Sequence, residues 1–283
     1  MQTDDTAVDG KRDRCAGVLV GLAAGDRNGG PVRLAIRLLE SLLEKKGFDK
    51  SDVVEKYLSY FRGPPHDSEK AFDTGHTFFS VFKLISEGRT SEEASTTVQG
   101  KYGSIGVGAA HRNAVISMAS VIDDKQLDSA VLSETYITHA NQISYEVSLF
   151  VTWLCRQLIT GTGWEDSIKI AMNGLHQCEV TDAIISAATC MKSRLSKDGY
   201  APAVLQAALH FLHQSNSFDD ALNASIAFAG CGNFCPVLVG TIGGARYGAR
   251  VILGEKSSLL LHCTGGLLTR IISGATNMGD TWK

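Results

Sequence analysis

The residues best placed to do chemistry lie at the start of a glycine-rich helix. The stretch "AGCGNFCPVLVGTIGGARYGA" (229–249) places Cys231, Asn233 and Cys235 where helix amides are exposed. Such amides favour an anion or a metal site, and the helix dipole lowers the pKa of a nearby thiol. The spacing is not the C-x-x-C of oxidoreductases, and the seven cysteines of the chain are widely spaced. We expect reduced, buried thiols, with a reactive Cys231 or Cys235 as the alternative.

The carboxylate of Asp26 is a second candidate. It lies within "GVLVGLAAGDRNGGPV" (17–32), where small residues share one face of a helix that breaks at Gly25-Asp26 and restarts at Pro31. Small residues permit close contact between helices, and the break exposes backbone amides beside the carboxylate. Asp26 is expected either to contribute to a ligand site or to cap a tight turn between helices.

Helices must position these residues. Apolar residues recur at helical spacing almost throughout, strand-like alternation is nearly absent and only five prolines occur. Capping boxes or close relatives predict helix starts at 90–93, 162–165 and 217–220. The expected helices span 15–46, 50–61, 74–87, 91–99, 107–121, 127–137, 142–160, 164–175, 180–195, 201–213, 218–229, 234–249 and 259–273.

Composition limits the class of protein. The 283 residues, 44% apolar, can form one large core, and no linker or fixed-period repeat divides the chain. We expect one compact all-α domain over 15–283, preceded by a flexible polar segment at 1–14. A net charge of −3, without a basic stretch or a signal peptide, predicts a cytoplasmic protein that binds neither nucleic acid nor membrane. The oligomeric state stays open.

Four segments in order add specificity to this pattern. They are "AFDTGHTFFSVFKLISEG" (71–88), "VGAAHRNAVISMA" (107–119), "ITHANQISYEVSLFVTWLCRQLITG" (137–161) and the glycine-rich helix of 229–249. Together with 17–32 they resemble the ADP-ribosylglycohydrolase family over nearly the whole chain. The resemblance implies a compact all-α protein whose helices surround a cleft with two magnesium ions, where ADP-ribose is cut from an acceptor.

The family's charged positions are altered in this chain. The resemblance places Arg33 where the family has a catalytic or metal-linked glutamate, and a guanidinium cannot shuttle a proton near neutrality. In the preferred register Phe72 and Asp73 fall on the metal-binding T-D-D-T, leaving one carboxylate of three ligands, whereas a register shifted to 74–77 leaves none. Cys231 and Asn233 replace two aspartates, although magnesium prefers hard oxygen ligands. We therefore predict no catalytic residue and no metal cofactor, the alternative being magnesium held by a rearranged ligand set.

The resemblance also marks a pocket. Gly108 and Arg112 fall in a segment that the family writes N-G-x-x-x-R, and Thr138-His139 falls on a Thr-His pair before a long helix. These four residues and Asp26 either line a pocket for an adenosine or ribose, or pack and cap helices. No histidine spacing of the H-x-x-x-H kind predicts zinc.

The altered positions favour a catalytically inactive protein with a structural role. The stretches "FDTGHTF" and "GCGNFCPVLVGTIGGARYGAR" are most similar to the J-crystallin branch of jellyfish eye-lens proteins and its selenoprotein J relatives. Two alternatives stay open: a magnesium-dependent hydrolase that removes ADP-ribose, and a non-catalytic module that binds an ADP-ribose-like ligand.

Overall fold

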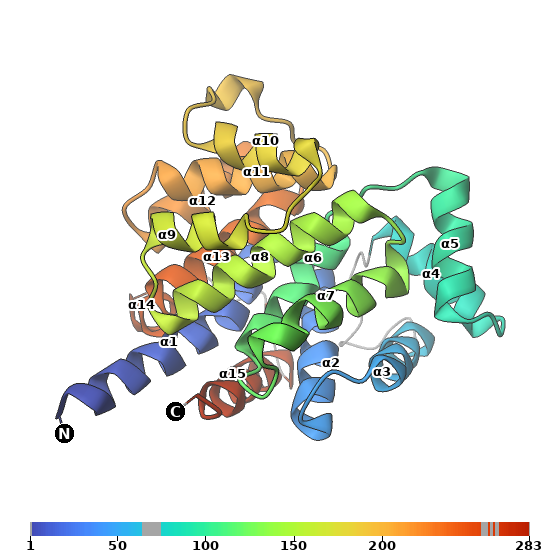
Figure 1. Ribbon diagram of the computed structural model, residues 1–283, viewed down its shortest axis with the longest axis horizontal. Coiled ribbons are helices and arrows are strands. Elements are labelled where there is room, and N and C mark those ends of the chain that lie inside the picture. Colours follow the sequence, from blue (N-terminus) through green and yellow to red (C-terminus); the bar gives the residue numbers. More distant parts are fainter. Residues whose placement is uncertain (1, 64–74, 256–259, 261–262, 264–265, 283) are drawn as a thin grey trace.

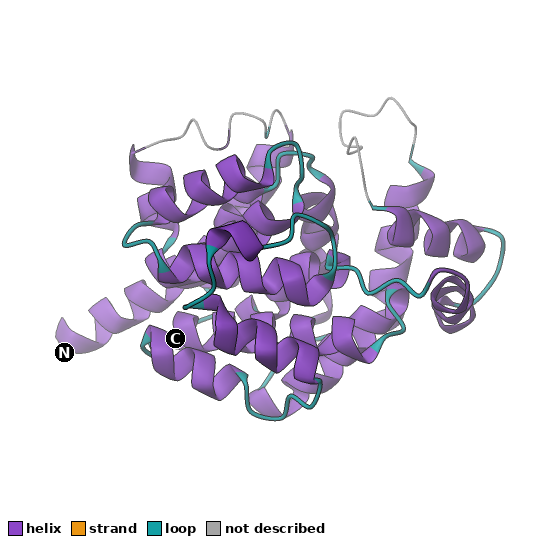
Figure 2. Ribbon diagram, turned by 90° about the horizontal axis from the view of Figure 1, so that it is seen from above, coloured by secondary structure: helices purple, strands orange, loops and turns teal. Residues whose placement is uncertain are grey.

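Helices account for nearly all the regular structure. The computed structural model describes residues 2–63, 75–255, 260, 263 and 266–282 (Figure 2). Within these ranges no strand occurs, and one isolated bridge pairs Gly106 with Tyr200. The prediction of an all-α fold is confirmed. In chain order the elements are α1 (Gln2–Gly25), α2 (Gly30–Lys45), α3 (Lys50–Arg62), α4 (His76–Ser86), α5 (Ser91–Tyr102), α6 (Gly108–Asn113), the 3-10 helix η1 (Ala114–Met118), α7 (Asp124–Thr138), α8 (Gln142–Thr160), α9 (Trp164–Ala171), α10 (Cys178–Ala187), the 3-10 helix η2 (Lys192–Arg194), α11 (Ala201–His213), α12 (Phe218–Ala229), α13 (Phe234–Tyr247), α14 (Ala249–Glu255) and α15 (Gly266–Gly279).

The closest helix pair is α1 with α13. A Cβ atom added to Gly21 would lie 2.1 Å from the carbonyl oxygen of Gly240, and one added to Gly17 would lie 2.1 Å from that of Gly244. The residue numbers rise along α1 as they fall along α13, so the two helices are antiparallel. Because only glycine leaves room for this approach, the small-residue face predicted from the sequence becomes a backbone-to-backbone contact.

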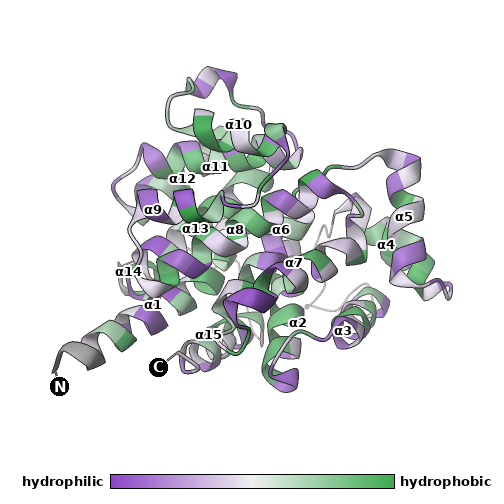
Figure 3. Cartoon of the chain, viewed as in Figure 1, coloured by the Kyte–Doolittle hydropathy of each residue, from purple (hydrophilic) through white to green (hydrophobic). Residues whose placement is uncertain are grey.

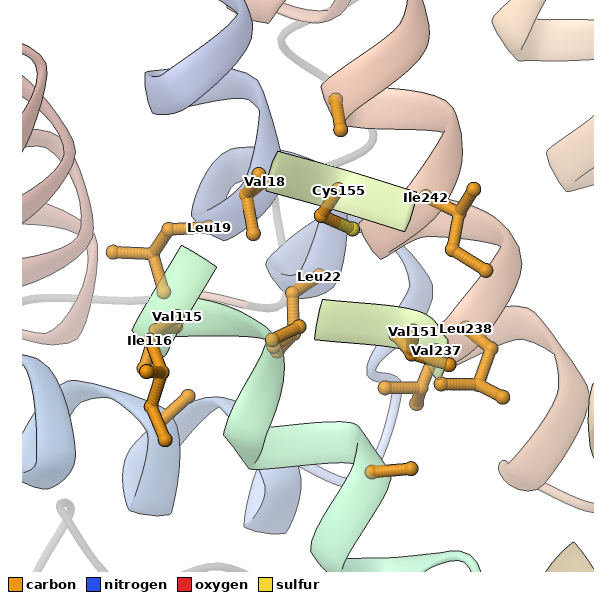
Figure 4. Close-up of a cluster of buried hydrophobic side chains, with 14 of the residues drawn as sticks. Val18, Leu19, Leu22, Val115, Ile116, Val151, Cys155, Val237, Leu238 and Ile242 are labelled. Carbon is orange, nitrogen blue, oxygen red and sulfur yellow. The ribbon is translucent and has the colours of Figure 1, made fainter. Parts of the chain in front are cut away.

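The core forms where η1 and α8 pack against this pair. Figure 4 shows side chains from these four elements converging, and all of them are fully or almost fully buried. They include Val18, Leu19 and Leu22 of α1, Val115 and Ile116 of η1, Val151 and Cys155 of α8, and Val237, Leu238 and Ile242 of α13.

The outer helices are amphipathic. Hydrophobic and hydrophilic residues lie side by side along the same helix in Figure 3, and α2 buries Leu34, Leu38 and Leu42 on one face. In Figure 1, α10, α11 and α12 gather on one side of the molecule, whereas α3, α4 and α5 lie at another end. The predicted helical spacing therefore marks the inward face of each element.

The N-terminal part of α1 differs from the prediction. The helix begins at Gln2 rather than at residue 15, and it ends at Gly25 instead of running on to 46. Charged side chains attach it to distant segments: Arg12 donates to the carbonyl of Trp282 at 3.3 Å, and Arg14 donates to that of Ile159 at 3.1 Å. Polar residues therefore continue the helix because tertiary partners accept their hydrogen bonds, which a search for apolar periodicity overlooks.

Of the three predicted helix starts with capping residues, one forms a full capping box and a second forms a side-chain cap. Thr90 and Glu93 exchange both hydrogen bonds of the box, and Ser217 accepts from the amide of Asp220. The helix start predicted at 162–165 is confirmed, because α9 begins at Trp164, but Thr162 does not cap it: Gly163 is the capping residue and the Thr162 hydroxyl donates to the Gln157 side chain at 3.2 Å. The predicted helix 107–121 divides into α6 and η1, and its final residues are not helical.

Candidate functional site

A cavity of about 410 Å³ opens between α2, α4, α6 and the start of α13. Its wall includes Asn28 before α2, His76 and Thr77 of α4, the segment 104–108, and His139 after α7. Among the described residues of the wall there is no aspartate or glutamate, and Arg112 is the one arginine or lysine. The cavity therefore differs from a site built to concentrate divalent cations.

Asp26 is fully buried behind this wall. Its Oδ1 accepts hydrogen bonds from the amides of Asn28 (3.2 Å) and Gly29 (2.8 Å) and from the side chain of Asn233 (2.7 Å). Its Oδ2 accepts from the amide of Val32 at 2.8 Å. Burial raises the pKa of Asp26, although these four hydrogen bonds oppose that shift. The structure thus gives Asp26 the capping role that the sequence left as one of two readings.

Asn233 joins the turn after α1 to the loop before α13. Its Nδ2 donates to Asp26, and its Oδ1 accepts from the amide of Arg27 at 2.9 Å. The Arg27 guanidinium donates in turn to the carbonyls of Gly230 (2.8 Å) and Gly232. Asn233 is 8% exposed and lies at the cavity wall. Asn233 can make both hydrogen bonds because an amide side chain carries a donor, used for Asp26, and an acceptor, used for Arg27.

Arg33 is not among the described residues that line the cavity. Its Nη1 donates to the carbonyl of Gly29 at 3.0 Å, one turn earlier in the same helix. Its charge also acts on Cys263, whose pKa burial raises to about 11. Phe72 and Asp73, the other altered positions, lie outside the described residues.

The two cysteines of the glycine-rich helix lie in different surroundings. Cys231 is exposed, whereas Cys235 is buried and burial raises the pKa of its thiol. A raised pKa keeps the thiol protonated near neutrality, which disfavours a nucleophilic role for Cys235.

A buried ion pair supports the opposite side of the cavity. The Nε of Arg112 donates to Glu134 at 2.5 Å, and its other nitrogens donate to the Thr138 hydroxyl (2.7 Å) and the Gly108 carbonyl (3.2 Å). Tyr57 adds a hydrogen bond to the same Glu134 oxygen at 2.8 Å. The side chains of Arg112 and Glu134 are 1% and 0% exposed, so the charge of each offsets the desolvation cost of the other. Arg112 therefore pairs with an acid and also lies at the cavity wall, whereas a role in ligand binding stays a prediction.

This network fixes the direction of the His139 ring. The Thr138 oxygen accepts from Arg112, so its own proton is available for the Nδ1 of His139, 2.7 Å away. With the Thr138 proton given to Nδ1, the ring carries its own proton on Nε2, which faces the segment that includes Gly106 and Gly108. A Cβ atom on Gly108 would lie 3.3 Å from this ring, so the glycine leaves room for it. His139 thereby presents an N–H donor at the cavity wall.

His111 is a second neutral histidine of the wall. Its Nε2 lies 3.0 Å from the Phe234 carbonyl, which can only accept, so Nε2 carries the proton. Burial lowers the pKa of His111 to about 4 and that of His139 to about 3, and the nearby Arg112 cation adds to both shifts. Both rings are therefore uncharged near neutrality, and neither carries the additional proton that a histidine acting as a general acid would donate.

Among the described residues, the donors present do not fit the magnesium ions that the family resemblance implies. Within the described parts of the chain, no group of three or more His, Cys, Asp or Glu side chains is arranged to hold a metal. The Asp26 carboxylate is already occupied by four donors, and Asn233 presents its amide to Asp26 and Arg27. Magnesium would have to displace these bonds before it met two charged oxygens.

Sequence reasoning missed several residues of this site. Arg27 and Glu134 contact a residue of the wall, and His111 and Phe234 are part of the wall, yet none of the four was singled out as a candidate. Arg27 and His111 directly follow or precede Asp26 and Arg112, and that adjacency was the available signal. Glu134 carried none, because its partner is 22 residues away in sequence.

Comparisons with known proteins agree with this architecture. The profile of the family described as ADP-ribosylglycohydrolase matches residues 32–269. The ADP-ribosyl-[dinitrogen reductase] glycohydrolase of Rhodospirillum rubrum is 24% identical over 215 residues, covering 76% of this chain and 67% of the relative. A solved structure described as an ADP-ribosylglycohydrolase-related protein complex has a TM-score of 0.76 at 19% identity, covering 97% of this chain and 100% of that one, and supports the fold. No helix in the described part of the chain has the length and apolar character needed to cross a bilayer. The profile match covers most of the sequence, and the chain therefore belongs to the ADP-ribosylglycohydrolase family.

Proposed function

We propose that this protein is a metal-independent member of the family that does not hydrolyse ADP-ribosyl bonds. The observation that carries the proposal is the hydrogen bond between Asn233 and Asp26. Where the family resemblance places a metal-binding aspartate, the chain has an amide that binds the Asp26 carboxylate directly. Arg33, at the position of the family's acid, bonds to a carbonyl of its own helix.

A structural role, such as that of an eye-lens crystallin, belongs to this proposal. Such a role needs a stable folded body and no competing chemistry. The extensive buried core and the close α1–α13 contact support the first requirement, and the raised thiol pKa of Cys15, Cys155 and Cys235 supports the second. The role itself is a proposal from the sequence resemblance to the J-crystallin branch.

The direct test compares hydrolysis and metal response. The protein is incubated with ADP-ribosylated dinitrogen reductase and magnesium, with the R. rubrum relative as the positive control. We expect no release of ADP-ribose and no change in melting temperature on adding magnesium. Release by the wild type would establish the alternative of a magnesium-dependent hydrolase, and a rise in its melting temperature would show that it binds magnesium and would contradict the proposed metal independence.

A restored ligand set provides the matched comparison. The variant carries Arg33→Glu, Phe72→Asp, Cys231→Asp and Asn233→Asp. Without metal it should be less stable than the wild type by a few kcal/mol, on the order expected for repulsion and desolvation of added carboxylates. Magnesium at about 100 times its dissociation constant should then stabilise the variant by roughly 2.7 kcal/mol. An equal response of wild type and variant would contradict the proposal.

The cavity favours a second candidate, a module that binds an ADP-ribose-like ligand without metal. The described wall has no carboxylate to repel a diphosphate, and His139 offers an Nε2–H donor there. A volume of about 410 Å³ lies in the range of small-molecule pockets. Calorimetry with ADP-ribose in the presence of a chelator would measure binding, and His139→Phe removes the donor while keeping a ring. No heat for the wild type would exclude this candidate and leave the structural role.

A further inference from the structure

Arg27 joins the turn after α1 to the loop before α13, which the family resemblance assigns to metal binding. Its backbone amide donates to Asn233, and its guanidinium donates to the carbonyls of Gly230 and Gly232. These carbonyls belong to the loop between α12 and α13, 203 and 205 residues away in sequence. One side chain thus holds together two segments that no helix connects locally.

The loop presents two backbone carbonyl oxygens to the Arg27 cation. Gly230 ends α12 with φ 63° and ψ −118°, a left-handed region that favours glycine, and the chain reverses there before α13 begins. Its carbonyl and that of Gly232 both accept from the Arg27 fork. Carbonyl oxygens are ligands that hard cations also take, whereas a planar guanidinium meets two of them with fixed geometry.

We propose that Arg27 is an internal cation that takes over the structural part of a bound metal's role. The guanidinium holds the 230–233 loop against the turn after α1, so the wall formed by Asn28, Asn233 and Phe234 keeps its shape at any divalent-ion concentration. The inference rests on the proposed function in one respect, that this loop does not bind metal. It adds the residue that replaces the metal and predicts that the cavity is fully formed in a chelator.

Hydrogen exchange of the loop tests the role of Arg27. In Arg27→Ala, the amides of 230–234 should exchange at least about tenfold faster than in the wild type, because two charge-assisted hydrogen bonds are lost. Millimolar guanidinium should slow this exchange again by entering the vacated space, whereas sodium at equal ionic strength should not. Arg194→Ala, which removes an exposed arginine from η2, is the control and should leave the loop unchanged.

A pair of milder variants keeps the test valid if Arg27→Ala does not fold. Arg27→Lys keeps the positive charge, and Arg27→Gln removes it at similar length. We expect faster loop exchange in Arg27→Gln than in Arg27→Lys, with both faster than the wild type. Equal exchange in the two variants, or in Arg27→Ala and Arg194→Ala, would overturn the proposal. These results concern the loop alone, whereas failure of the proposed function would appear as hydrolysis or a magnesium response of the wild type.

Discussion

Replacing Gly21 by alanine should separate the central helix pair. The new Cβ would lie 2.1 Å from the Gly240 carbonyl oxygen and 3.0 Å from the Gly244 Cα, against about 3.5 Å for an ordinary non-bonded contact between carbon atoms. Both obstacles are backbone, so α1 and α13 must move apart by about 1 Å, a gap that forfeits a quarter to a half of each dispersion contact.

The expected net cost is large because the strain exceeds the gain in helix propensity. Alanine favours the helix by about 1 kcal/mol over glycine, whereas overpacking a core costs typically about 1–3 kcal/mol and more where nothing can yield. We expect Gly21→Ala to lower the unfolding free energy by about 3 kcal/mol, the upper end of the range for overpacking. Urea denaturation followed by far-ultraviolet circular dichroism, which reports helix content, would measure this loss.

A matched glycine gives the opposite sign. Gly100 lies exposed in α5, and a Cβ atom there would meet nothing within 4 Å. Gly100→Ala should therefore stabilise the protein by about 0.5–1 kcal/mol. In the double variant Gly21→Ala/Gly240→Ala, the second substitution should cost less than the first, because the helices have already separated. If Gly21→Ala were as stable as Gly100→Ala, the close backbone contact would not exist in solution.

Acid should destabilise the protein through the histidines of the cavity. In the folded protein the pKa is about 4 for His111 and about 3 for His139, below the ordinary value of 6.5. Below about pH 6.5 the unfolded chain therefore binds more protons than the folded protein, and the unfolding free energy falls as the pH drops. The expected loss near pH 4 is about 3 kcal/mol for each histidine. Urea titrations at successive pH values should show a shallower acid loss in His139→Phe, and an unchanged slope would refute the assignment. Glu134→Gln should cost about 3–5 kcal/mol because it leaves the Arg112 cation buried without its counter-ion. Adding Arg112→Met to Glu134→Gln should recover part of that loss in the same assay, and a further loss would show that the arginine is stabilising by itself.

The sequence predicted much of the helical framework because an amphipathic helix shows itself in the spacing of apolar residues close together in sequence. Apolar periodicity located most of the helices, and Pro31 and Ser217 marked two of their starts. The spacing of Gly17 and Gly21 indicated a close helix contact before its partner was known. Where polar residues continued a helix, as in the first turns of α1, the same reasoning failed because tertiary hydrogen bonds replaced the apolar pattern.

By itself the sequence also determined which charges are present at the family's positions. Arg33, Cys231 and Asn233 are a cation, a thiol and an amide whatever the fold, and that chemistry predicts the loss of metal binding before any coordinates exist. The sequence could not determine what these residues do instead, because residue type fixes the capacity to donate and accept but not the partner.

Only the tertiary structure decided those partners. Asp26 and Asn233 are 207 residues apart, and they meet because the glycine contacts bring the end of α1 against the start of α13. Arg27 reaches the loop before α13 for the same reason. Hydrogen bonds require the two atoms to be placed within a few tenths of an ångström, and that placement comes from the packing of whole helices, which no local spacing encodes.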